Sequence, residues 1–188
     1  MSARAAAARW RRFRDDRRGN VLVEAAFGMV ILIGLISGGV EVARYVLLQQ
    51  KLDRTAMTVG DLVSRGTLLT EAEVANIFAA VPHLVQPFDF GSEGRVVLSA
   101  VRREDGGAAE VVWQRFNDQG LAVESRLGVL GEAASLPEGL TPQPNENLFI
   151  AEVFFDFEPM FGSGLLGAHR LYHRSVYRAR LSEQVITQ

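Results

Sequence analysis

The chain of 188 residues lacks cysteine, which excludes disulfide bonds and thiolate chemistry but leaves its redox compartment open. Proline is absent between residues 20 and 81, so no proline ring interrupts a helix there. Positive charge is scarce after the beginning. Residues 1–18 hold seven arginines and two aspartates, a net charge of +5, so the remainder carries −7 within the total of −2. An acidic body argues against nucleic-acid binding, which depends on neutralising phosphates.

Residues 21–40 read VLVEAAFGMVILIGLISGGV and contain a single charge, Glu24. A helix of this length is about 30 Å long, which matches the hydrocarbon thickness of a bilayer. A buried core helix is the alternative, but soluble helices usually keep a polar face and residues 25–40 have none. Basic residues stay on the cytoplasmic side of a membrane. We therefore predict a cytoplasmic leader at 1–19 and a membrane span at 21–40, with the rest of the chain outside.

A cleaved secretory signal is a second interpretation of this run, because Ser37 and Gly39 have the spacing that signal peptidase favours. The pair Arg11-Arg12 is only a weak match to a twin-arginine signal. Against cleavage, a helical pattern continues past residue 40. Mostly apolar residues recur there at alternating steps of three and four: Val42, Tyr45, Gln49, Leu52, Ala56, Val59 and Val63. This pattern predicts one helix over residues 20–66, with a single apolar stripe in its second half.

Gly19 separates the basic leader from the apolar run, and Glu24 follows it five residues later. An ionised carboxylate inside a bilayer is costly, so intramembrane acids tend to be paired and functional. A cut after Gly19 would create an ammonium group at Asn20, one helical turn from Glu24 and able to pair with it or with a neighbouring subunit's glutamate. Glycine also resists the helix, as a protease that binds an extended substrate requires. The alternative is a carboxylate that reaches back to the lipid headgroups, favoured by the helix N-terminus.

Residues 18–65 resemble the TadE-like proteins, minor pilin-like components of the tight-adherence (Flp) pilus and secretion machinery. The shared elements are Gly19, the triplet Val23-Glu24-Ala25, the apolar run 27–40 and an amphipathic helix rich in glutamine and alanine at 49–56. Residues 111–115 and 152–159 are similar to later segments of such proteins. Major Flp pilins are far shorter and have tyrosine where this chain has Ala25. The resemblance therefore indicates a minor, pseudopilin-type component.

The resemblance implies cleavage between Gly19 and Asn20 by a prepilin peptidase, an inner-membrane anchor, and pilin, pseudopilin and inner-membrane assembly proteins as partners, with no cofactor. In this hypothesis Glu24 sets the register between subunits through a charge pair. Small residues in the span allow close helix packing: Gly28, Gly34, Gly38 and Gly39. The competing hypothesis is a signal-anchored periplasmic binding or sensory module that is not cut at Gly19. Its mature N-terminus would be Met1 or Ser2 and not Asn20.

Residues 67–188 are typical of a small α+β domain. Thr70 and Glu73 form a capping box that predicts a helix to Val81, ending at Pro82 and leaving His83 in a loop. Four strands are predicted at 95–103, 110–117, 147–158 and 170–182, with a hairpin turn at 104–107. Residues 118–146 are expected to be loop-rich, with a short strand at 121–124 as an option.

The third predicted strand has an apolar face with a period of two residues. We expect this face to pack on the long helix and so to form a pilin-like architecture, a long N-terminal helix laid on a small antiparallel sheet. Its residues are Phe149, Ala151, Val153, Phe155 and Phe157.

The sequence does not predict an enzyme or a metal site. His169 and His173 would share one face of a helix, but their surroundings favour a strand, where they would lie about 13 Å apart and could not share an ion. Residues 162–164, Gly-Ser-Gly, lack the flanking spacing of a nucleophile elbow. The last predicted strand, at 170–182, has four arginines on one face. We expect them to form an exposed basic strip that either docks an acidic partner or protects a sheet edge. They are Arg170, Arg174, Arg178 and Arg180.

Overall fold

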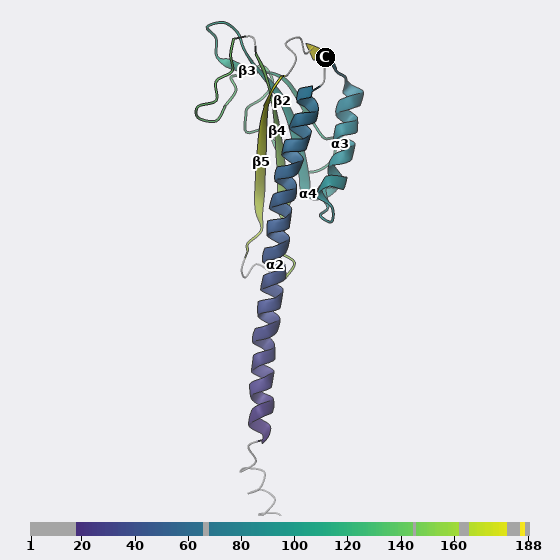
Figure 1. Cartoon of the computed structure of the whole chain (residues 1–188), viewed down its shortest axis with the longest axis vertical. Helices are drawn as coiled ribbons and strands as arrows, with labels where there is room; N and C mark the ends of the chain where they lie inside the picture. The colour runs from purple at the N-terminus through teal and green to yellow at the C-terminus, as the bar shows by residue number, and fades with distance from the viewer. Residues whose placement is uncertain (1–17, 66–67, 145, 162–165, 180–184, 187–188) are drawn as a thin grey trace, which may run out of the picture. The chain divides into compact units, whose positions relative to one another are not determined.

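The computed structural model describes residues 18–65, 68–144, 146–161, 166–179 and 185–186. The chain divides into two compact units, Met1–Val42 and Ala43–Gln188. One helix, α2, is assigned from Arg18 to Arg65, so the predicted long helix is confirmed to within two residues at either end. The fold is α+β, with α2 and a small antiparallel sheet as its main parts (Figure 1).

The first unit contains residues 18–42 of α2, and its side chains are largely uncovered. Every described side chain between residues 19 and 36 is exposed, including Phe27, Ile31 and Leu35. Apolar surface of this extent is costly in water, and a monomeric soluble protein rarely exposes it. The helix is long and apolar enough to cross a membrane.

The second unit is built on four antiparallel strands in the order β3-β2-β4-β5. They are β2 (Gly94–Arg103), β3 (Ala109–Phe116), β4 (Asn147–Phe157) and β5 (His169–Arg178). All four predicted strands are confirmed, although residues 180–182 of the last prediction lie outside the described part. The hairpin turn is confirmed as well: Gly107 N donates to Glu104 O at 3.1 Å, and Gly106 has the positive φ of 75° that glycine adopts readily.

Residues 43–65 of α2 cover one face of this sheet. The predicted apolar face of β4 is confirmed as core, because all five residues are buried in one cluster with the helix stripe. The stripe itself differs slightly from the prediction, since Leu48 is buried while Gln49 is half-buried and Val42 is 46% exposed. The buried helix residues are Leu48, Leu52, Ala56, Val59 and Val63.

The opposite face of the sheet is also buried, which the sequence pattern did not predict. Leu148 and Ile150 of β4 pack there with Leu127 from the long loop between β3 and β4. A β-bulge helps, because Val101 pairs with Val111 and Ala100 pairs with Trp113, leaving Val112 as an extra residue in β3. Val111 therefore joins this second cluster, whereas Trp113 joins the helix-covered core.

Helix α3 (Glu71–Val85) begins at the predicted capping box: Thr70 N donates to Glu73 Oε2 at 2.9 Å, and Glu73 N donates to Thr70 Oγ1 at 3.3 Å. The predicted end at Pro82 was wrong, because the helix continues to Val85 and includes His83. A proline in the last turn removes one backbone hydrogen bond, and the buried side chains of Val81 and Val85 hold the final turn against the core.

The remaining elements are short. Helix α4 spans Phe90–Glu93, and β1 (Leu68–Leu69) pairs in parallel with β6 (Val185–Ile186). Residues 121–124 do not form the optional strand and lie in the loop-rich segment, as the rest of 118–146 does where it is described. The loop is tied to β2 by Arg95 Nη1, which donates to Leu121 O at 2.7 Å.

Candidate functional site

Gly19 and Asn20 lie in the first turn of α2, and Glu24 follows on the next turn as an exposed side chain. The peptide bond between Gly19 and Asn20 is therefore helical in this structure. A peptidase that binds extended substrate must open this turn, and glycine lowers the cost of opening because it favours the helix less than any residue except proline. The helix N-terminus also carries partial positive charge, which favours a carboxylate nearby.

Glu24 and the four small residues of the apolar run share one side of α2. At about 100° per residue, Gly28, Gly34, Gly38 and Gly39 fall with Glu24 inside an arc of about 140°. A methyl group added at Gly28, Gly34 or Gly39 would meet nothing within 4 Å. Packing within the described chain therefore does not require these three glycines, and the face they form is open to a second helix.

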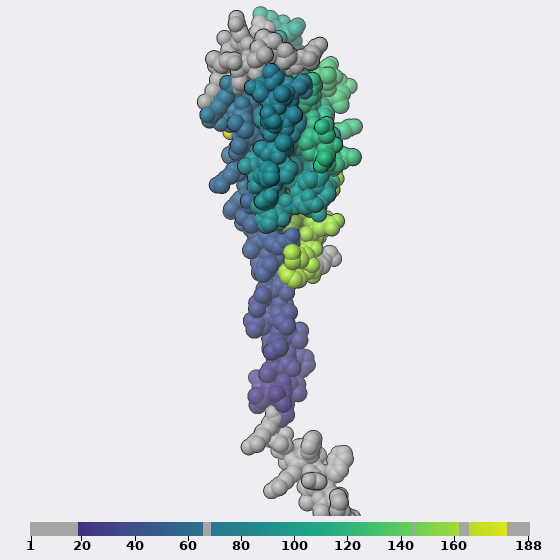
Figure 2. Space-filling view, turned by 90° about the vertical axis from the view of Figure 1, so that its right-hand side faces the viewer, coloured from purple at the N-terminus to yellow at the C-terminus, as the bar shows by residue number. Residues whose placement is uncertain are grey.

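The second unit has a groove of about 420 Å³ between α3 and the end of β3. Its apolar lining includes Phe78, Phe90 and Phe116, while Asn117 and Asp118 contribute polar atoms. Figure 2, a space-filling view, looks onto the side of the unit that carries α3, with its teal atoms toward the viewer. The groove combines apolar side chains with a few polar groups, as ligand sites commonly do.

An ion pair closes one border of this groove. The Arg115 guanidinium binds the Glu71 carboxylate through Nη2 at 2.6 Å and Nε at 3.0 Å, and it lies 5.4 Å from the centre of the Trp113 ring. These hydrogen bonds from Arg115 lower the pKa of Glu71. The pair joins α3 to β3 at the surface beside the groove.

A fully buried carboxylate, Glu152, lies in the middle of β4 on the face away from α2. It accepts hydrogen bonds from Tyr172 OH at 2.9 Å, from Arg126 N at 3.1 Å and from Ser125 Oγ. Burial and the neighbouring Glu152 charge raise the pKa of Tyr172, so its hydroxyl keeps its proton and remains a donor. Three donors satisfy the carboxylate and fasten the long loop to the sheet.

The two histidines of the last strand lie on β5, as predicted, and face different partners. His169 Nδ1 lies 2.6 Å from Gly167 O, whereas His173 Nε2 meets Gln49 Oε1 and its Nδ1 lies 3.7 Å from Asp53 Oδ1. His173 thus links β5 to α2. Among the residues that the structure describes, no three His, Cys, Asp or Glu side chains gather as metal ligands.

The expected basic strip is only partly present. Arg170 Nε binds Asp156 Oδ1 at 2.6 Å, and Arg178 Nε lies 3.4 Å from Glu146 Oε1, so these two charges are paired. Arg174 is exposed on the same strand, while Arg180 and the Gly-Ser-Gly segment at 162–164 lie outside the described residues. β5 is an edge strand, and charged side chains along it discourage pairing with another sheet.

Sequence reasoning missed two residues that fix the geometry of the second unit. A methyl group at Gly60 of α2 would lie 2.5 Å from Ser175 Oγ and 2.7 Å from Tyr177 Cδ2, so this glycine permits close contact between helix and strand. Its position inside an apolar stripe was the available signal. Glu152 is the other, and its signal was an acid with apolar residues directly before and after it in β4.

These features define an α+β protein with one candidate membrane-spanning helix at its N-terminal side and an antiparallel sheet packed on the second half of that helix. Comparisons with protein-family models, with curated proteins and with solved structures gave no match.

Proposed function

We propose that this chain is a minor pilin-like (pseudopilin) component of a tight-adherence (Flp) pilus assembly machinery. Prepilin peptidase cuts it after Gly19, α2 anchors it in the inner membrane with the leader in the cytoplasm, and the second unit lies in the periplasm. The observation that carries the proposal is the placement of Gly19 and Glu24 in the first turns of an uninterrupted helix whose next sixteen residues are apolar or small.

The chemistry of the helix start supports this function. Once the bond after Gly19 is cut, Asn20 carries an ammonium group about 40° around the helix from Glu24 and one turn away. In a medium of low dielectric constant this opposite charge offsets the cost of the buried carboxylate. A carboxylate without such a partner inside the bilayer would be costly. When the ammonium group and Glu24 belong to neighbouring subunits, their pairing also fixes the register between the two helices.

The exposed glycines of α2 supply the surface for assembly. A methyl group at Gly28, Gly34 or Gly39 would meet no atom of the described chain within 4 Å. Another helix can therefore approach the backbone closely on the side that carries Glu24. Helices in membranes associate through small residues of this kind, because apolar burial gives no driving force in lipid. Charge pairing and close packing therefore act on the same side of the helix.

Assembly of charge variants tests this proposal. Glu24→Gln keeps the size of the side chain but removes its charge. Gly19→Phe, the blocked variant, places a bulky side chain before the bond and prevents the cut. Both variants should insert in the membrane and fail to enter or prime fibres, as measured by membrane fractionation and by sheared-fibre yield. Leu22→Gln is the matched control, because it adds the same amide about 160° away on the helix and should leave assembly intact. Normal fibres from both Glu24→Gln and the blocked variant would reject the proposal.

A signal-anchored periplasmic binding or sensory module is the second candidate, and the groove beside α3 favours it. Ala79 lines that groove, whereas its neighbour Ala80 is exposed on α3 and does not. A binding module should lose function in cells when Ala79→Trp fills the groove and should keep it with Ala80→Trp. Equal behaviour of the two variants, together with a mature N-terminus at Asn20, would eliminate this candidate.

A further inference from the structure

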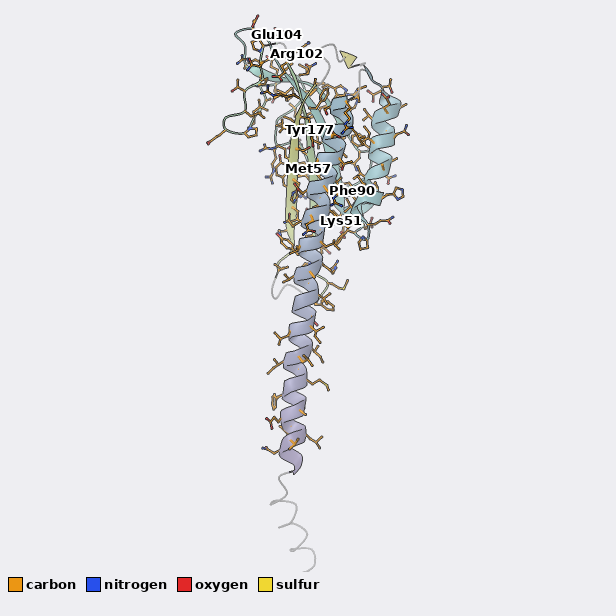
Figure 3. All side chains as sticks on the ribbon, in the orientation of Figure 1. Lys51, Met57, Phe90, Arg102, Glu104 and Tyr177 are labelled. Carbon is orange, nitrogen blue, oxygen red and sulfur yellow. The ribbon has the colours of Figure 1, made fainter. Side chains whose placement is uncertain are left out.

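The end of the second unit at which α2 enters is marked by an aromatic contact. The Tyr45 ring lies 5.4 Å from the Phe157 ring and 5.5 Å from the His169 ring, measured between centroids. Phe157 and His169 form the last register pair of β4 and β5. The connection between these strands therefore starts at this end of the unit, whereas Arg102 and Glu104 lie at the opposite end (Figure 3).

The first residues of this connection expose apolar side chains. Met160 is 61% exposed and Phe161 is 56% exposed, directly after Pro159. Val129 and Leu130 are also exposed side by side, in the loop beside β3, so what distinguishes Met160 and Phe161 is the end of the unit at which they lie. The hairpin turn at the opposite end contains Glu104 and Asp105.

Chain connectivity brings this end close to the candidate membrane span. Tyr45 follows Val40, the last residue of the predicted span, by five residues. Five residues extend about 7.5 Å in a helix and at most about 18 Å in any conformation. The segment from Val40 to Tyr45 is helical, so Tyr45 lies about 7.5 Å along the helix from the end of the predicted span, roughly the thickness of one headgroup layer.

We propose that Met160 and Phe161 insert into the outer interface of the bilayer and form a second membrane contact beside the α2 span. The proposal rests on the membrane span of the proposed function and adds a surface that holds the second unit against the lipid. Apolar side chains such as these can be buried at the boundary between the headgroups and the acyl chains.

The charges at this end indicate which lipid the contact uses. Burial raises the pKa of Glu93, and so do three acids near it, Asp89, Glu158 and Asp156, whereas Arg44 opposes them. An acidic cluster is not attracted to anionic headgroups, so the contact depends on apolar insertion and needs no anionic lipid. Zwitterionic phosphatidylcholine is therefore the probe that tests it.

The absence of cysteine allows a direct test with single labels. Met160→Cys, Leu130→Cys and Ile31→Cys are each labelled with a nitrobenzoxadiazole fluorophore in the full chain, reconstituted in phosphatidylcholine nanodiscs with or without doxyl-labelled lipid. Leu130 is exposed and apolar but lies in the loop paired with the far end of β3, so it is the matched control. Labels at positions 160 and 31 should show blue-shifted emission and loss of intensity with doxyl lipid, while position 130 should show neither.

Each remaining outcome has a distinct meaning. A label at position 160 that behaves like the one at 130, while position 31 is quenched, overturns the interfacial contact and leaves the membrane anchor intact. An unquenched label at position 31 overturns both. Adding Phe161→Ser to the Met160→Cys chain should reduce the quenching, and unchanged quenching would mean proximity without insertion, which also contradicts the proposal.

Discussion

Residues 18–42 and residues 43–65 of helix α2 have opposite surroundings. In residues 18–42 the large apolar side chains are exposed, and a methyl group at Gly28, Gly34 or Gly39 would meet nothing within 4 Å. In residues 43–65 one stripe is fully buried, and Gly60 lies against Ser175 and Tyr177. Residues 43–65 pack on the sheet of the same chain, whereas the proposed function gives residues 18–42 their partners, lipid and neighbouring helices.

The two isolated acids repeat this contrast. Glu152 is completely buried and accepts hydrogen bonds from three donors of its own chain. Glu24 is exposed on a helix of apolar neighbours. A structure of one chain therefore accounts for Glu152 in full, while a partner for Glu24 belongs to the proposed assembly.

Leucine truncation should separate the two parts of α2 most strongly. Leu52→Ala removes a fully buried side chain and should destabilise the second unit by about 3 kcal/mol, whereas Leu32→Ala should leave its unfolding unchanged. Urea unfolding in detergent, followed by the buried Trp113 in a Trp10→Phe background, measures both. Equal losses of unfolding free energy in Leu52→Ala and Leu32→Ala would contradict the stated difference between the two parts of α2.

Removal of the buried acid should have the next largest effect. Glu152→Ala leaves Tyr172, Ser125 and Arg126 N without their acceptor and should cost about 2 to 3 kcal/mol of unfolding free energy. Glu24→Ala should leave the same unfolding curve unchanged. Hydrogen exchange should also rise in the loop around residues 121–128 in the first variant only. An unchanged unfolding free energy in Glu152→Ala would mean that apolar packing alone holds the loop.

The glycines provide a finer comparison. Gly60→Ala places a methyl group against Ser175 Oγ and should cost about 1 to 2 kcal/mol, because overpacking outweighs the gain in helix propensity. Gly34→Ala should not alter unfolding of the second unit but should weaken helix association in the membrane. Thermal unfolding and cross-linking in membranes measure these two effects. Stabilisation by Gly60→Ala would show that the helix can move away from β5.

The smallest effect is expected at the sheet edge. Asp156→Asn breaks the pair with Arg170, which is well exposed, and should cost about 0.5 kcal/mol. The hydrogen bond from Arg170 lowers the pKa of Asp156 below its ordinary value of 3.8. A carboxyl group whose pKa is lowered in the folded state stabilises the fold at pH values above its pKa in the unfolded chain. This contribution is lost as the pH falls through the lowered pKa. The difference between wild type and variant should therefore shrink below about pH 4, and a constant difference down to pH 2 would contradict the assignment.

Much of this fold follows from local sequence patterns. The long helix, the capping box at Thr70 and all four strands were predicted because periodicity, propensity and turn residues agree there. The end of α3 was misplaced because buried Val85 holds a turn that Pro82 alone would disfavour. The burial of both sheet faces, Gly60 and Glu152 depend on contacts far apart in the chain, which a single sequence read locally does not specify. For the candidate site, the sequence suggested Gly19 and Glu24, and the structure added the shared face with the glycines.

The mass of the N-terminal peptide of the membrane-bound protein tests the central claim most directly. In cells with prepilin peptidase, the peptide should begin at Asn20 with Glu24 as its fifth residue, and in cells without the enzyme it should retain the leader. A peptide that begins at Met1 or Ser2 in both strains would contradict the account, because Glu24 would then lack the ammonium group proposed as its partner.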